Sequence, residues 1–163
     1  MAEAEHDHAP AHGGATQLPP ARQRYLDGSD LLAKTQALRL ASVDNAGWPH
    51  DTLLSAGDML GRSLEGLRFG PFARSTTAGN LARDGRAVLT LALEAGQCEG
   101  RLRVSRLQPD EGPLALYEGM VDELRMHVAP CAEVTSGIVF RLHQPDSVQP
   151  RWRRQLAALQ RAK

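Results

Sequence analysis

Apolar residues recur along this chain with two different spacings, and the spacings predict its elements. Alternating or short continuous apolar runs indicate strands, whereas apolar positions three or four apart indicate helices. Two strand-like runs, Leu38–Val43 and Trp48–Ser55, flank the turn sequence Asp44-Asn45-Ala46-Gly47, which predicts a β-hairpin. Ala87–Leu93 is apolar at all positions but one and predicts a further strand.

The stretch between Leu67 and Leu93 predicts a strand, a turn, a short helix and a second strand. Gly70-Pro71 ends the first strand, and Arg74–Thr77 opens a helix that ends near Asp84-Gly85. Serine and threonine are favoured N-caps because their hydroxyls accept from the unpaired N–H groups of a first turn. The same N–H groups, with three hydroxyls and the Arg74 guanidinium, would suit a phosphate. The plainer interpretation is that the hydroxyls only cap the helix.

The remaining pattern predicts three more helices and two more strands, with a glycine-punctuated loop between residues 57 and 66. From Ala21 to about Leu38 the chain is expected to be helical, and Ser29 or Asp30 could cap a second segment before Leu31. The other expected elements are a strand over Glu99–Leu107, a helix over Leu114–His127, a strand over Val134–Leu142 and a helix opened by Pro150. Strands dominate the middle of the chain without regular βαβ alternation. This favours a mainly β (α+β) fold, an antiparallel closed or half-closed barrel with peripheral helices.

The length of 163 residues suits one domain with its own core. Residues 1–20 form a low-complexity tail rich in Ala, His, Gly and Pro, for which we expect disorder, and residues 21–163 would form the domain. The tail histidines His6, His8 and His12 could bind a transition metal. Because such tails more often have no specific role, we expect no metal site.

Charge and cysteine content limit the class of partner. Lys+Arg and Asp+Glu each number 19, so the net charge is zero, which argues against a dedicated nucleic-acid or membrane-surface binder.

Cys98 and Cys131 lie in no C-x-x-C motif, which suits a reducing compartment. No apolar run is long enough to cross a bilayer, and the N-terminus does not have the pattern of a signal peptide. We therefore expect a soluble cytoplasmic protein.

Common catalytic motifs are absent from the sequence. There is no G-x-G-x-x-G after a strand, no Walker A lysine, no G-x-S-x-G and no H-E-x-x-H. No side chain stands out as a nucleophile. If the protein is an enzyme, a cofactor is expected to carry its chemistry.

Two segments in order, LRLASVDNAGWPHDTLLS and RSTTAGNLARDGRAVLTL, resemble the FMN-binding split-barrel family of pyridoxamine 5'-phosphate oxidase and its relatives. The resemblance runs from about Leu38 to Leu142. The positions that match the family pattern are Val43, Asp44, Gly47 and Pro49 in the first segment and Ser75, Asn80, Leu81 and Arg86 in the second.

The resemblance implies an antiparallel split barrel that forms a homodimer, with two FMN sites at the subunit interface and a small-molecule substrate that stays unknown. The residues that it assigns to the cofactor are Thr52, Leu53, Leu54 and Ser55 along the ring, Arg74, Ser75, Thr76 and Thr77 at the phosphate, Asn80 in the helix, and Trp152 and Arg154 from the C-terminal region. For the C-terminal helix, docking on the barrel or on the partner subunit is the plainer interpretation.

Two positions depart from the family pattern. The usual phosphate-binding lysine falls at Thr77, and the arginine that the oxidase carries in its second strand falls at Thr52. The missing charges argue against pyridoxamine phosphate oxidase activity itself. Two hypotheses therefore stay open: an FMN-dependent oxidoreductase, or a non-catalytic dimeric module that binds or senses a flavin, a deazaflavin, haem or another ligand.

Overall fold

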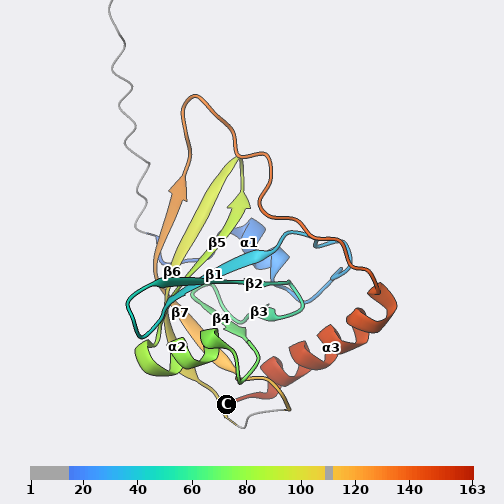
Figure 1. The fold of residues 1–163 in the computed structure, drawn as a ribbon. Coiled ribbons are helices and arrows are strands. Elements are labelled where there is room, and N and C mark those ends of the chain that lie inside the picture. Colours follow the sequence, from blue (N-terminus) through green and yellow to red (C-terminus); the bar gives the residue numbers. More distant parts are fainter. Residues whose placement is uncertain (1–14, 109–111) are drawn as a thin grey trace, which may run out of the picture.

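The computed structural model describes residues 15–108 and 112–163 (Figure 1). One antiparallel seven-stranded sheet, in the order β2-β1-β5-β6-β7-β4-β3, organises the fold. The strands are β1 (Leu38–Val43), β2 (Pro49–Leu54), β3 (Met59–Gly61), β4 (Gly66–Phe69), β5 (Arg86–Leu93), β6 (Gly96–Arg106) and β7 (Tyr117–His127). The helices are α1 (Pro20–Tyr25), α2 (Thr76–Asp84) and α3 (Pro145–Arg161). This is the split barrel with peripheral helices that the sequence predicts.

The sheet curls around a core made by the alternate side chains of its strands. Leu38 and Leu40 of β1 and Leu89 of β5 are each fully buried. The residues that alternate with them along each strand are more exposed. β1 and β2 pair in register from Leu38 with Leu54 to Val43 with Pro49, which confirms the predicted hairpin. The alternation buries one face of the hairpin and leaves the other exposed.

A second apolar cluster joins α3 to the outside of the barrel. Trp152, Leu156 and Leu159 lie on one face of α3 and are buried against residues that include Leu31 and Leu116. The predicted apolar face of this helix is confirmed, but the helix begins at Pro145 and Pro150 lies inside it. Figure 1 shows α2 and α3 flanking the curled sheet as separate peripheral helices.

The helix predicted over Leu114–His127 is wrong, because most of this stretch is strand β7. Leu116, Met120 and Leu124 are four apart, but they do not share a face: Met120 is 45% exposed while the other two are buried. β7 pairs with β6 and β4, and a bulge at Arg101/Leu102 shifts the register. The four-residue spacing therefore arises from a bulged strand with two partners.

The strand predicted over Val134–Leu142 is also wrong. This segment touches the end of the loop before β1 through one bridge, with Ala37 N donating to Ile138 O at 2.7 Å and Phe140 N donating to Thr35 O at 2.9 Å. The short strand β3 lies in the stretch that the glycine spacing predicts as a loop.

The helix predicted over Ala21–Leu38 ends at Tyr25. Gly28 and Asp30 adopt positive φ angles of 80° and 45°, which an α-helix cannot contain. The tail predicted for residues 1–20 lies mostly outside the described residues. Its described part contacts the barrel, since Leu18 is buried and its N–H donates to Leu64 O at 2.6 Å.

The loop after α1 is held by Asp27. Its Oδ1 accepts from Lys34 Nζ at 2.6 Å and from the N–H and hydroxyl of Ser29 at 2.8 and 2.7 Å. Partial desolvation raises the pKa of Asp27, but the bonds from Lys34 and Ser29 outweigh it and lower this pKa to about 2.

We expect Asp27 to make the stability of the protein dependent on acid. Because its native pKa lies below the unfolded value of about 3.9, its contribution is complete above that pH and is lost as the pH falls toward about 2. The difference in Tm between the wild type and Asp27→Asn should therefore shrink as the pH is lowered from about 5 to about 2. A difference that stays constant over this range would contradict the assignment.

Within the described part of the chain, none of the helices has the length and apolar character needed to cross a bilayer.

Candidate functional site

The exposed N-terminus of α2 is the candidate functional site. Ser75 has an extended backbone, and its hydroxyl accepts from Ala78 N at 3.1 Å, which is the expected N-cap. Gly85 adopts a φ of 68° at the other end, and its N–H donates to Leu81 O at 2.9 Å. Local sequence therefore sets both ends of this helix, as predicted.

Side-chain hydrogen bonds fix α2 on the barrel. Asn80 Nδ2 donates to Ser42 Oγ of β1 at 3.0 Å, and both residues are buried. The hydroxyl of Tyr117, in β7, donates to Ala78 O at 3.0 Å. The Arg83 guanidinium donates to a backbone carbonyl at the end of β1. These bonds tie the helix to two strands and so hold its N-terminus in one place.

The first turn of α2 keeps donors available. Among the described residues, no acceptor pairs with the N–H groups of Thr76 and Thr77. The Arg74 side chain is exposed and makes no ion pair with any described residue, while Thr77 is 1% exposed. A helix N-terminus carries a partial positive charge, so this tip combines free donors, hydroxyls and a cation.

The predicted site residues of β2 differ in the face of the hairpin on which they lie and in their burial. Thr52 pairs with Leu40, so it lies on the same face of the hairpin as Ser42, which bonds to α2. Leu53 faces outward and is 54% exposed, whereas Leu54 is buried. β2 is an edge strand, so its outer backbone groups have no partner strand in the described part of the chain. Thr52 and the α2 residues therefore share one face of the hairpin.

Ser55 closes a turn. Its hydroxyl donates to Asp58 Oδ2 at 2.6 Å and accepts from Gly57 N at 3.2 Å. The resemblance implies that Ser55 lies beside the isoalloxazine ring. Its side chain is buried, however, and these two hydrogen bonds already occupy its hydroxyl.

The Trp152 side chain is part of the hydrophobic core of its own chain. It is 3% exposed, packs edge-on against Phe140 with ring centroids 6.4 Å apart, and leaves no room for a side chain at Gly57. Arg154 lies on the exposed face of the same helix. We therefore do not carry Trp152 into the proposed site.

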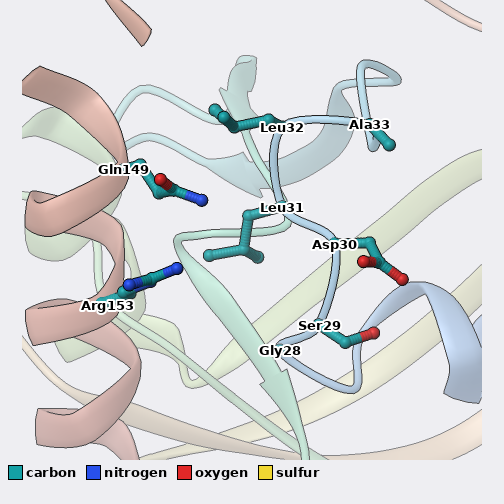
Figure 2. Close-up of a pocket in the computed structure, with 8 residues that line it drawn as sticks. All are labelled: Gly28, Ser29, Asp30, Leu31, Leu32, Ala33, Gln149 and Arg153. Carbon is teal, nitrogen blue, oxygen red and sulfur yellow. The ribbon is translucent and has the colours of Figure 1, made fainter. Parts of the chain in front are cut away.

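A separate cavity of about 400 Å³ lies between the loop over residues 28–33 and α3 (Figure 2). Gln149 and Arg153 extend from α3 toward Leu31, while Ser29 and Asp30 point away from the helix. No motif in the sequence indicated this cavity. In the described ranges, no group of three or more His, Cys, Asp or Glu residues could hold a metal ion.

The anchor between Asn80 and Ser42 can be tested by stability. Asn80→Ala leaves the buried Ser42 hydroxyl without its donor, which should lower the free energy of unfolding by about 1–3 kcal/mol. Asn45→Ala, in the exposed hairpin turn, is the matched control and should change it by less than about 0.5 kcal/mol. Urea unfolding of both variants measures this, and equal effects would show that the bond contributes nothing.

Comparisons with known proteins identify both a relative and a fold. No protein-family model matches the chain. The uncharacterised protein YclD of Bacillus subtilis is 31% identical over 140 residues, which cover 83% of this chain and 91% of YclD.

Among solved structures, a candidate pyridoxamine 5'-phosphate oxidase from Lactobacillus delbrueckii has a TM-score of 0.56 at 13% identity, covering 69% of this chain and 97% of that one. HupZ from Group A Streptococcus has a TM-score of 0.53 at 11% identity, with coverages of 72% and 99%. The haem storage protein HutZ of Vibrio cholerae has a TM-score of 0.50 at 13% identity, with coverages of 68% and 95%. The chain thus belongs to one family with YclD and folds as a pyridoxamine 5'-phosphate oxidase-like split barrel.

Proposed function

We propose that this protein binds FMN, with the phosphate at the N-terminus of α2, and acts as a homodimeric flavin-dependent oxidoreductase. The observation that carries the proposal is the exposed helix tip, where the N–H group of Thr76 has no partner among the described residues and lies beside Arg74. A phosphate dianion is stabilised by the positive end of a helix and by charge-assisted hydrogen bonds.

The rest of the cofactor would lie along β2. The outer backbone groups of this edge strand could bond to the polar edge of the isoalloxazine ring, and Thr52 lies on the face of the hairpin that carries α2. The bound flavin would supply hydride or electron transfer. The chain itself would hold the phosphate, orient the ring and exclude water.

A second copy of the chain would close this site. Trp48, Leu53 and Phe72 expose 71%, 54% and 57% of their surface, and each lies on β2, on its hairpin or just before α2. Large exposed apolar side chains favour a protein cover. We therefore propose that the cofactor lies between two subunits, which sedimentation of the purified protein with and without FMN would test.

A non-catalytic dimeric binding or sensing module is the second candidate. It is favoured by the uncharged residues Thr52 and Thr77, because the proposed phosphate-binding site then has fewer cations than the family pattern has. The fold shared with a haem storage protein adds haem to the ligands that such a module could take.

The visible absorbance spectrum of untagged protein separates the two candidates. An oxidoreductase should purify with a flavin spectrum or acquire one when FMN is added, and the bound flavin should be reducible. A haem spectrum would favour the second candidate. A colourless protein that binds no added FMN would refute the proposed flavoprotein.

A further inference from the structure

Two neighbouring cavities lie where α3 packs beside the loop that follows α1. The first, of about 400 Å³, is the one shown in Figure 2, and the second, of about 430 Å³, lies between α3 and the end of β3. Gly28 and Arg153 line both cavities. Each volume is within the range of small-molecule sites in proteins, about 300–1,000 Å³. The two cavities therefore have room for a small organic molecule.

Two arginines line the second cavity from different elements. Arg153 extends from α3 toward the loop (Figure 2), and Arg62 follows directly after β3. Both residues are exposed, and neither makes an ion pair with any described residue. The N–H of Arg62 donates to Gly66 O at 2.9 Å, and the N–H of Gly61 donates to Leu26 O at 2.8 Å, so the backbone after β3 is held in place. The cavity thus presents two guanidinium groups from anchored elements.

The carboxylates around the cavities do not cancel this charge. Asp27 lines the second cavity, but its Oδ1 lies 2.6 Å from Lys34 Nζ, so this lysine balances its charge. Asp30 lines the first cavity, and its side chain points away from α3 (Figure 2). The two arginines therefore leave an excess of positive charge that an anionic ligand could neutralise.

Apolar side chains form another part of the cavity walls. Leu60 and Leu156 line the second cavity, and Leu31 lines the first. Guanidinium groups form charge-assisted hydrogen bonds with phosphate oxygens, and two of them match the charge of a phosphate dianion. The combination of two cations with leucine side chains suits a ligand that has a phosphate at one end and an apolar body.

We propose that these cavities bind a small phosphate monoester, with its phosphate between Arg62 and Arg153 and its organic part against the leucines. The site lies on α3, β3 and the loop after α1, and none of its residues belongs to α2. The inference therefore does not rest on FMN binding at the N-terminus of α2.

Titration of the full chain with phenyl phosphate, followed by ¹H–¹⁵N NMR at about pH 7.5, tests the proposal. At this pH a phosphate monoester is mostly a dianion, because its second pKa is about 6. We expect saturable shifts in residues 27–33, 60–62 and 149–160. Phenol and inorganic phosphate each lack one part of the ligand and should bind at least roughly tenfold more weakly. Shifts confined to residues 74–78, or equal affinity for inorganic phosphate, would overturn the proposal.

Arginine variants test which cations hold the phosphate. Arg62→Gln/Arg153→Gln should weaken phenyl phosphate binding by roughly tenfold or more, because both charged donors are lost. Arg151→Gln, the matched control, removes an exposed arginine of α3 that lines neither cavity, and it should leave the affinity unchanged. Arg74→Ala should also leave it unchanged, which separates this site from the one at α2.

The amide shifts of the β1–β2 hairpin serve as the internal reference for the fold of the double variant. Both replaced side chains are exposed, so these shifts should match those of the wild type. Undiminished binding by the folded double variant, or an equal loss of affinity in Arg151→Gln, would overturn the assignment of the phosphate to Arg62 and Arg153.

Discussion

Replacing Arg74 by alanine should weaken FMN binding by roughly tenfold or more. A hydrogen bond to a charged group contributes about 1.5–3 kcal/mol, and about 1.4 kcal/mol corresponds to a factor of ten in the dissociation constant. The Arg74 side chain is exposed and unpaired among the described residues, so its loss should not disturb the fold. Quenching of flavin fluorescence during titration measures the effect.

Arg151→Ala is the matched control for this prediction. It removes an exposed arginine from α3, outside the proposed site, and should leave the FMN affinity unchanged. Ser75→Ala is a less specific probe, because it removes the N-cap of α2 and should also cost about 1 kcal/mol of stability. Equal losses of affinity in Arg74→Ala and Arg151→Ala would point to a general charge effect and against the helix tip.

Trp152→Ala should be strongly destabilising, lowering the free energy of unfolding by about 3–5 kcal/mol. The indole is 3% exposed and fills the space between α3, Gly57 and Phe140, so its removal leaves a cavity between the helix and the barrel. Urea unfolding followed by circular dichroism measures the change.

The other tryptophan provides the control. Trp48 is 71% exposed in the hairpin turn, so Trp48→Ala should change stability by less than about 0.5 kcal/mol. If both variants lost the same stability, α3 would not be packed on the barrel through Trp152.

The elements that the sequence predicts correctly are those with local signals. The hairpin is specified by its turn residues and by the alternation in β1 and β2. α2 is specified by a capping serine at its start and a left-handed glycine at its end. In both cases a few neighbouring residues decide the backbone, so no long-range contact is needed to predict it.

The elements that it misses depend on distant partners. β7 is a strand because β6 and β4 pair with it, and the bulge that disguises its alternation lies in the pairing with β6. The segment over residues 134–142 has strand-like composition, but among the described residues its backbone pairing is limited to one bridge and a bond from Val134 N to Ala95 O. Periodicity records the side chains of one segment and not the availability of a neighbouring strand.

In the candidate site, too, some features are set by local sequence and others by distant contacts. The cap at Ser75 and the exposed donors of α2 follow from local sequence. Its anchors do not: Tyr117 reaches α2 from a strand for which the apolar spacing predicts a helix, and Ser42 is a small polar residue with no motif around it. Trp152 was assigned to the cofactor by resemblance, and only packing shows that the ring is buried under its own chain.

The central claim, that the N-terminus of α2 binds the phosphate of a flavin, is tested most directly by comparing FMN with riboflavin, which has the same ring and no phosphate. We predict that the wild-type protein binds FMN with a Kd in the micromolar range or below, and riboflavin at least roughly tenfold more weakly, since the helix tip then has no anion to bind. Equal dissociation constants for the two flavins, or no binding of either, would contradict the account.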